Sequence, residues 1–373
     1  MLKIVVGCYE QIVLGYTIKP GSDGESLESS PYFTDHSQKG CIKCASAGGR
    51  YVATGSTDET ICLYDMQKGT ELGTLQGHSG AITQLLFPDD THLMSCSEDG
   101  SICIWEAGPE GTLLKTLHGH KGAVTAIAAH PSGKLGMSVS PKDGSLRTWN
   151  LMTGRSVFIK NMKKFEPEFI RWSYDGKYYV VASLHEIQVF ELESAKCILE
   201  STIDEQILAL EFLPVETHHM LAIGDGSGNI QIINIHSEKC RKKFKAHESR
   251  VKCINIIKPQ TQQKPDEMWL TSGSSDGNLK IWRLNNEYIN SSNKTEEADC
   301  LLSIQTNARV TCLTVWQEPS DSKTLKDANE NNTKNRETTE GKNKDKIIAQ
   351  RRKRKQNQRL NQKKKLQKLL GDE

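Results

Sequence analysis

The sequence has no run of about 18 consecutive apolar residues, the length that a bilayer-spanning helix needs. Met1–Lys19 is interrupted by Glu10 and Gln11 and lacks the small-residue cleavage site of a signal peptide. We therefore expect a protein that is neither secreted nor membrane-spanning. Its 11 cysteines, an odd number, lie mostly in strand-like segments, which predicts reduced core thiols of an intracellular protein.

Complete motifs for catalysis or metal binding are also missing. Gly224–Gly228 (GDGSG) resembles a phosphate-binding loop, but a strand-like segment follows it where a helix N-terminus is needed, so we predict a turn. Cys41 and Cys44 have the spacing of zinc ligands, yet no second ligand pair lies at a suitable interval. We expect no metal, no cofactor and no small-molecule substrate.

What the sequence does contain is a repeat. Ser97–Glu106 (SEDGSICIWE) returns as Ser274–Arg283 (SSDGNLKIWR), as Lys142–Asn150 (KDGSLRTWN) and, with tyrosine for tryptophan, as Ser56–Asp65 (STDETICLYD). Six copies, two of them more divergent, lie 41 to 49 residues apart. A period of about 40–45 residues with strands in each unit indicates a β-propeller.

The residues of a single copy of the repeat, Ser97–Glu106, also predict a propeller blade. Its Asp-Gly pair is typical of a tight turn, because Asp bonds nearby backbone and Gly accepts positive φ. In the strand that follows, Ile102 and Ile104 lie on one face, and Cys103 and Trp105 on the other. Since both faces are apolar, the strand belongs inside a stack of blades.

The number of blades follows from the first strand of each unit, which occurs seven times. The third strand also occurs seven times if Gln11–Ile18 is included. The sequence therefore predicts an all-β, seven-bladed propeller over residues 1–316, whose seventh blade takes its first strand from Val310–Trp316 and the other three from the N-terminus. Closure removes exposed sheet edges. We expect Gly21–Ser30 to be a loop, followed by a short strand near Pro31–Phe33. The predicted first strands are Cys41–Ala45, Ile82–Phe87, Val124–Ala129, Glu168–Trp172, Ile207–Phe212, Val251–Ile257 and Val310–Trp316.

The repeat resembles the WD-repeat family. Gly77-His78 and Gly119-His120 precede their tryptophans by 27 and 29 residues, similar to the Gly-His and Trp-Asp signature of that family. The resemblance implies a buried hydrogen-bonded network of His, a strand Ser or Thr, the turn Asp and the Trp, which is structural and not catalytic. Units four and five lack the His, the Asp or both. The implied network residues are His78, Asp99 and Trp105; His120, Asp143 and Trp149; His247, Asp276 and Trp282; and, in part, His36, Asp58 and Tyr64.

Three peptides outside the repeat pattern carry a narrower resemblance: Gly7–Gln11, the segment from Gly154 to Asn161, and Thr306–Arg309. They resemble the WD-repeat proteins that interact with p21-activated kinase. The resemblance covers about residues 4–316. It implies a nucleolar assembly factor of the large (60S) ribosomal subunit that also restrains the kinase. Its expected partners are pre-ribosomal proteins, ribosomal RNA precursors and the regulatory region of the kinase.

The composition changes after Trp316. Residues 317–341 contain one large apolar residue, Leu325, and we predict a flexible linker because such a segment cannot offset its ordering entropy. Residues 342–373 hold 13 basic and 3 acidic side chains, a net +10, whereas residues 1–341 carry the remaining −8 of the total +2. This tail is the predicted anion-binding part.

Two basic clusters separated by a spacer favour nuclear import and RNA contact over a merely solubilising tail. The absence of Gly and Pro from Lys342–Leu370 allows a helix on contact with RNA, and the lack of aromatic residues argues against sequence readout. The residues predicted to direct import or contact RNA are Arg351, Arg352, Lys353, Arg354, Lys355, Lys363, Lys364 and Lys365.

Two classes of function remain open. The first is a non-enzymatic scaffold of ribosome assembly in the nucleus and nucleolus. The second is a cytoplasmic signalling adaptor that binds and inhibits the kinase without a ribosomal role. A substrate receptor for a ubiquitin ligase has no specific residue to support it. Enzyme activity is the poorest fit, because the His, Asp and Ser sets recur once per repeat.

Overall fold

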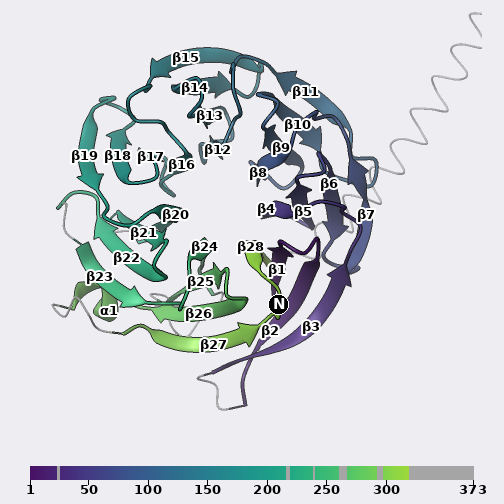
Figure 1. The fold of residues 1–373 in the computed structure, drawn as a ribbon, viewed down its shortest axis with the longest axis vertical. Helices are drawn as coiled ribbons and strands as arrows, with labels where there is room; N and C mark the ends of the chain where they lie inside the picture. Colours follow the sequence, from purple (N-terminus) through teal and green to yellow (C-terminus); the bar gives the residue numbers. More distant parts are fainter. Residues whose placement is uncertain (23–25, 216–218, 238–239, 260–266, 292–296, 319–373) are drawn as a thin grey trace, which may run out of the picture. The chain divides into compact units, whose positions relative to one another are not determined.

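The structure, a computed structural model, describes residues 1–22, 26–215, 219–237, 240–259, 267–291 and 297–318. Seven four-stranded antiparallel sheets follow one another around a ring (Figure 1). Met1–Glu318 forms one compact unit. The predicted all-β seven-bladed propeller is therefore confirmed. The predicted linker, apart from its first two residues, and the predicted basic tail lie outside the described residues.

Each blade runs from an inner to an outer strand, and all seven predicted first strands are present. Blades 1 and 2 consist of β4 (Ile42–Gly48), β5 (Tyr51–Ser56), β6 (Ile61–Asp65), β7 (Thr70–Leu75), β8 (Ile82–Leu86), β9 (His92–Ser97), β10 (Ile102–Glu106) and β11 (Leu113–Leu117). Blades 3 and 4 consist of β12 (Ala126–Ala129), β13 (Leu135–Ser140), β14 (Ser145–Asn150), β15 (Arg155–Asn161), β16 (Phe169–Trp172), β17 (Tyr178–Ala182), β18 (Glu186–Glu191) and β19 (Cys197–Thr202).

The remaining blades include the one that joins the chain ends. Blades 5 and 6 consist of β20 (Ile207–Leu213), β21 (Met220–Asp225), β22 (Asn229–Asn234), β23 (Cys240–Lys245), β24 (Val251–Ile257), β25 (Met268–Ser274), β26 (Asn278–Leu284) and β27 (Asp299–Gln305), with the short helix α1 (Asn286–Asn290) between β26 and β27. Blade 7 consists of β28 (Val310–Gln317), β1 (Leu2–Cys8), β2 (Val13–Pro20) and β3 (Leu27–Asp35).

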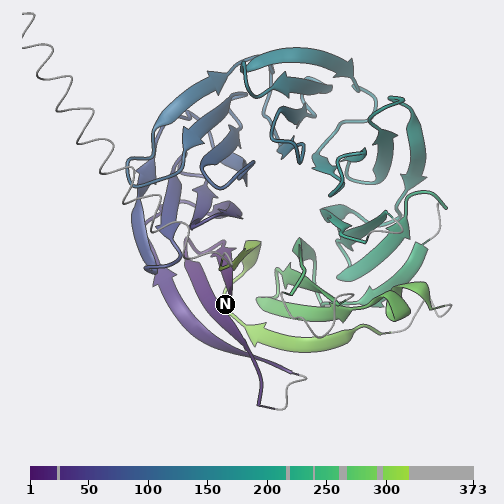
Figure 2. The ribbon, with the colours of Figure 1, turned by 180° about the vertical axis from the view of Figure 1, so that it is seen from behind.

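Blade 7 closes the ring as predicted. β28 and β1 pair antiparallel from Leu2↔Gln317 to Gly7↔Cys312, with β28 at the inner rim and β1 next to it (Figures 1 and 2). A Cβ on Gly7 would come within 2.6 Å of the Cys312 sulfur, so only glycine allows this approach at the seam. The Trp316 indole donates to the Gly49 carbonyl of blade 1 at 2.8 Å. The chain ends thus form one blade and bind it to its neighbour.

One predicted loop is wrong. The expected loop over residues 21–30 is shorter, because β3 begins at Leu27 and pairs with β2 from Pro20↔Leu27 onward. Leu27 is buried beside Ile18 in the apolar cluster between blades 6 and 7. Pairing with β2 and burial of this single leucine outweigh the polar, loop-like composition of the segment.

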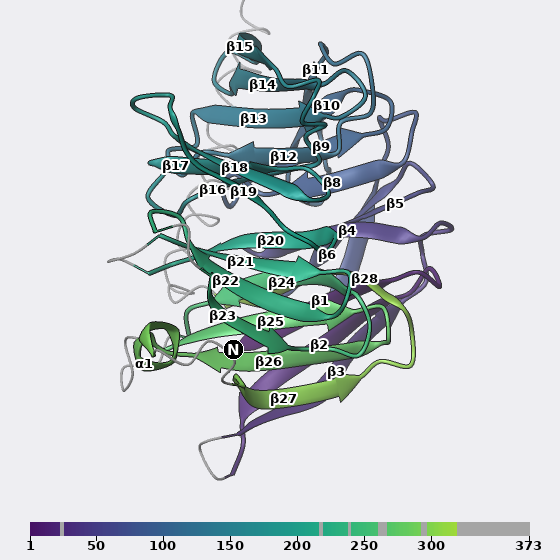
Figure 3. The same cartoon turned by 60° about the vertical axis from the view of Figure 1, so that its left-hand side comes forward.

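The core is divided into seven apolar clusters, each between two adjacent blades. The blades are stacked in this way in the side view of Figure 3. On β10, Ile102 packs toward blade 3, whereas Cys103 and Trp105 pack toward blade 1, so the predicted two-sided burial is confirmed. Burying each large apolar side chain contributes about 1.5–3 kcal/mol. Stability therefore depends on every blade having two neighbours.

Candidate functional site

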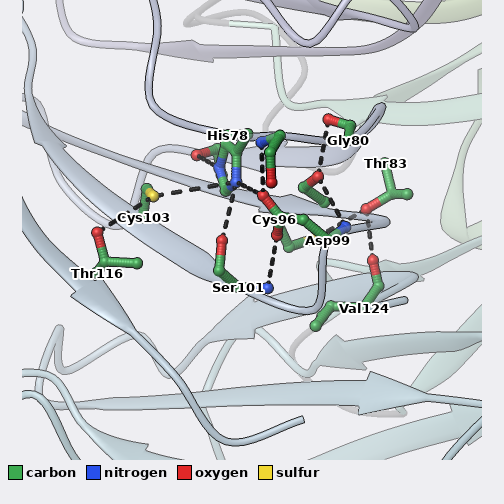
Figure 4. A network of polar contacts seen from close by, with 12 residues as sticks. His78, Gly80, Thr83, Cys96, Asp99, Ser101, Cys103, Thr116 and Val124 are labelled. Carbon is green, nitrogen blue, oxygen red and sulfur yellow. Dashed lines mark hydrogen bonds and ion pairs between the residues drawn. The ribbon is translucent and has the colours of Figure 1, made fainter. Parts of the chain in front are cut away.

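Blade 2 contains the most complete polar network of the fold (Figure 4). His78, in the loop before β8, has its Nδ1 3.0 Å from Oδ2 of Asp99 in the β9–β10 turn. Its Nε2 lies 2.7 Å from Oγ of Ser95, which accepts the Trp105 indole N–H at 2.8 Å. These bonds are all satisfied when Nδ1–H donates to the carboxylate and the serine hydroxyl donates to Nε2. The network ties β9 and β10 to the loop before β8 and to the β9–β10 turn.

The environment fixes the protonation of this network. Burial lowers the pKa of His78, although Asp99 opposes the shift. Burial tends to raise the pKa of Asp99, but hydrogen bonds from Ser101 and from the Ser79 backbone outweigh it and lower the pKa to about 2. Neutral imidazole and ionised carboxylate are therefore the stable forms at neutral pH. Gly100, at φ 84°, provides the turn that brings the carboxylate under the ring.

Blade 3 repeats the arrangement. His120 Nδ1 lies 3.0 Å from Asp143 Oδ2, and its Nε2 lies 2.7 Å from Ser138 Oγ. The Trp149 indole donates to the same serine at 2.8 Å. The side chain of His120 is fully buried, and burial lowers its pKa. The structure thus brings together the predicted residues of blade 3 as it does those of blade 2.

Blade 6 departs from the prediction. His247 Nε2 lies 2.7 Å from Ser272 Oγ, which accepts the Trp282 indole N–H at 2.9 Å. However, neither His247 Nδ1 nor Asp276 Oδ2 has a hydrogen-bond partner among the described residues. Asn278 stands where Ser101 bridges the ring and the turn in blade 2, and the predicted link from His247 to Asp276 is absent there. Burial lowers the pKa of His247 to about 4.

In blade 1 the predicted histidine, His36, is not part of the network. His36 is exposed, whereas Gln38 is buried in the place that histidine takes in blades 2 and 3. The Thr54 hydroxyl donates to the Gln38 side-chain oxygen at 2.7 Å. Asp58 accepts the backbone N–H after Gln38, as Asp99 accepts that of Ser79. The Tyr64 hydroxyl turns instead to Asp35, at 2.8 Å. The predicted residue His36 was therefore wrong by two positions, because the loop before β4 brings Gln38 to the network.

The strand serines were not assigned from the sequence. Ser95 and Ser272 each precede their tryptophan by 10 residues, and Ser138 precedes Trp149 by 11, so a serine 10 or 11 residues before the tryptophan is the signal that could have identified them. Each of the three serine hydroxyls is held between an imidazole and an indole. The His78 side chain is 1% exposed, which gives a substrate no access to it. The arrangement therefore holds strands and loops together and is not an open catalytic site. We call each of these His–Ser–Trp groups, in blades 2, 3 and 6, a clamp.

The inner strands line an axial cavity of about 660 Å³, to which β28 contributes Thr311–Val315. Arg171 Nε lies 3.2 Å from Glu211 Oε2 in its wall, and burial raises the pKa of Glu211 despite this partner. Lys43 and Lys252 also line the cavity, and burial lowers the pKa of Lys252. The wall of the axial cavity is therefore polar and charged, unlike that of an apolar ligand pocket.

The part of the chain that the structure describes has neither a membrane-spanning helix nor a group of metal-binding side chains. Within it, no helix has the length and apolar character needed to cross a membrane. In the same residues, no three His, Cys, Asp or Glu side chains are grouped to hold a metal ion. Gly224 and Asp225 end β21, and residues 226–228 form the turn to β22, with Asp225 accepting from the backbone N–H of Asn229 at 2.8 Å. The predicted tail residues lie outside the described ranges.

The ring of blades with repeated His–Ser–Trp clamps defines a WD-repeat propeller. Residues 28–65, 69–106 and 111–150 match the family described as WD domain, G-beta repeat. Residues 180–327 match the family described as LRRK2 beta propeller. Propellers of this class typically act as non-catalytic scaffolds.

Sequence identity to known proteins places the chain in one family of WD-repeat propellers. The chain is 39% identical over 322 residues to p21-activated protein kinase-interacting protein 1-like of Danio rerio, covering 86% of this chain and 82% of that protein. It is 38% identical to p21-activated protein kinase-interacting protein 1 of Homo sapiens, covering 84% and 77%. It is 26% identical to Shk1 kinase-binding protein 15 of Schizosaccharomyces pombe, covering 76% and 77%. The chain belongs to the p21-activated protein kinase-interacting protein 1 family.

Proposed function

We propose that this protein is a non-catalytic scaffold in assembly of the large ribosomal subunit, and that it acts in the nucleolus. The observation that carries the proposal is the separation of charge along the chain. Residues 342–373 hold a net +10, and the rest of the chain holds −8. A cationic tail binds the phosphates of RNA without sequence preference. The family resemblance then selects ribosome assembly among RNA-rich processes.

The propeller supports the scaffold role by its construction. Seven blades closed through β28 and β1 give a rigid body with several faces, and the clamps of blades 2 and 3 fix their loops from within. Loops on a rigid framework are suited to partner recognition. The proposed partners are pre-ribosomal proteins on the propeller and ribosomal RNA precursors along the tail.

A second function is favoured by the names of the relatives, which describe kinase-interacting or kinase-binding proteins. In this function the propeller binds the regulatory region of p21-activated kinase and restrains its activation. Both functions can coexist, because the tail serves the first and the propeller can serve either. Kinase binding alone does not require the +10 tail.

The two functions differ in location and in dependence on the tail. We expect the full chain, tagged in cells, to stain nucleoli and to sediment with precursors of the large subunit. A variant with Arg351–Lys355 changed to alanine is expected to lose both, while it still binds the kinase regulatory region. Exclusion of the full chain from nucleoli would leave the cytoplasmic adaptor as the better account.

A further inference from the structure

The outer strand of blade 3, β15 (Arg155–Asn161), differs from every other outer strand. In the described residues β3, β7, β11, β19, β23 and β27 each bury at least one side chain, whereas β15 buries none. It forms the outermost arc of its blade in Figure 1. Of the residues on β15, Val157, Phe158 and Ile159 are 63%, 57% and 53% exposed. Three adjacent large apolar side chains thus face solvent at the outer edge of the sheet, which pairs with no further strand among the described residues.

The pairing register of β14 and β15 shows one difference between blade 3 and blade 2. Lys160 pairs with Leu146, at the position where Leu117 pairs with Ile102 in blade 2 and seals the core. The ammonium group of Lys160 lies instead over the ring of Phe190 in blade 4, 3.5 Å from its centroid. A polar residue also stands at this position in blade 4 (Ser201) and blade 7 (Asp35), but β15 alone has no buried side chain elsewhere along the strand to anchor it.

Ile159 is the clearest departure. Every other blade carries a polar residue at the matching register position, so an outward-facing isoleucine is not required by the fold. Those residues are Thr34, Thr74, Thr116, Glu200, Lys243 and Ser303. Proteins usually protect edge strands with charge or polar side chains, because an apolar edge pairs with other chains. β15 has the opposite composition and is suited to accept a further strand.

The surroundings of β15 are basic. Residues 142–164 contain six Lys or Arg and one acid, a net +5, in a segment of the chain whose first 341 residues carry −8. Lys160, Lys163 and Lys164 line a hollow of about 430 Å³ next to the C-terminal end of β15. An extended segment that carries apolar side chains toward Phe158 and acidic ones toward these lysines matches both features.

We propose that β15 is a docking edge for an extended, acidic and apolar segment of a partner protein, which adds to blade 3 as a fifth strand. Backbone hydrogen bonds along β15 hold the segment, Val157, Phe158 and Ile159 contact its apolar side chains, and the lysine hollow selects acidic ones. A second copy of this chain is disfavoured, because its own β15 carries the same positive charge. RNA is disfavoured, because only Phe158 of the three exposed apolar side chains offers a stacking surface for bases, and the aliphatic Val157 and Ile159 offer none. The inference does not depend on the ribosomal role.

The proposal can be tested with a defined probe and the full chain. The probe is a fluorescein-labelled peptide of about nine residues that alternates Glu with Ile, a length that spans one strand. Binding is measured by fluorescence anisotropy. We expect saturable binding, loss of binding when Lys replaces Glu in the peptide, and loss when alternate peptide amides are N-methylated, because methylation removes the donors that pair with β15.

The variant V157T/I159T places at Ile159 the residue that blades 1, 2 and 7 carry there, and it is expected to weaken binding about tenfold. Its melting temperature should be unchanged, because both side chains are more than half exposed. The matched control L113T/L114T removes two exposed leucines from β11 and should bind like the unmodified chain. Backbone hydrogen exchange of Ser156–Lys160 should slow when the peptide binds.

Four results would overturn the proposal. They are equal binding of the V157T/I159T and unmodified chains, equal binding of the N-methylated peptide, displacement of the peptide by an RNA oligonucleotide that itself requires Val157 and Ile159, and a dimer in light scattering that the substitution dissolves. The last two would assign the edge to RNA or to a second copy of this chain.

Discussion

Replacing Asp99 with alanine tests whether the blade 2 network stabilises the fold. Asp99 accepts hydrogen bonds from the His78 ring at 3.0 Å, from the Ser79 backbone at 2.9 Å and from the Ser101 backbone at 2.7 Å. Its side chain is 11% exposed, so water cannot fully replace it. The substitution leaves the imidazole N–H of His78 with only the Ser101 hydroxyl, 3.0 Å away, as an acceptor, and it removes the acceptor of the Ser79 and Ser101 backbone N–H groups.

The magnitude follows from two estimates of the same interaction. A stranded buried polar group costs about 1–3 kcal/mol. Lowering the carboxyl pKa from 3.8 to about 2 corresponds to about 2 kcal/mol of stabilisation at pH 7. We therefore expect Asp99→Ala to lower the free energy of unfolding by about 2–3 kcal/mol. Urea unfolding at pH 7, followed by the fluorescence of the six tryptophans, measures this loss.

Two controls separate the network from a general effect of substitution. Asp276→Ala removes a carboxylate that bonds only the Asn278 backbone among the described residues, at 2.8 Å, and should cost about 1 kcal/mol. His185→Ala changes an exposed residue of blade 4 and should cost less than about 0.5 kcal/mol. Equal losses in Asp99→Ala and His185→Ala would refute the assignment of His78 to a stabilising network.

Further predictions concern the seam, the tail and pH. Deleting Met1–Ile18 removes β1 and most of β2 and leaves β28 with an open edge, so the protein should fail to fold; a monomeric truncation that melts like the full chain would contradict ring closure. If six tail cations contact phosphate, RNA affinity should fall roughly a hundredfold or more between about 50 and 200 mM salt, and normal nucleolar staining after changing Arg351–Lys355 to alanine would exclude those residues from targeting. Burial lowers the pKa of His247 to about 4, below the value of about 6.5 in the unfolded chain. The contribution of the neutral imidazole to the free energy of unfolding is therefore complete above pH 6.5, and up to about 3 kcal/mol of it is lost as pH falls toward 4. Urea midpoints at pH 7 and pH 5 measure this loss, and His247→Gln should make the stability depend less on pH.

The fold could be predicted because the repeat records the blade. Apolar residues on both faces of the strand ending at Trp105, and a turn before it, require neighbours on both sides. The split seventh blade followed from counting strands. The start of β3 could not be predicted, because Leu27 is a single apolar residue in a polar segment and only its pairing with β2 shows it to be a strand.

The site was less predictable, because it depends on register and loop length. The sequence placed His36 in the blade 1 network, whereas the loop brings Gln38 to that position. It placed Asp276 beside His247, but the contact depends on a bridging serine that blade 6 lacks. The exposed β15 looked like any outer strand, since only its pairing shows Lys160 at the position of a core leucine. The tail residues remain predictions from composition.

The most direct test of the central claim is a sucrose-gradient profile of cells depleted of this protein, with the full chain and a chain ending at residue 341 as rescue variants. Assembly of the large subunit predicts fewer free large subunits while small subunits persist, and accumulation of precursor RNA. The full chain should restore the profile, and the chain without the basic tail should restore it poorly. An unchanged ratio of large to small free subunits, with normal precursor processing, would contradict the claim and favour the signalling adaptor.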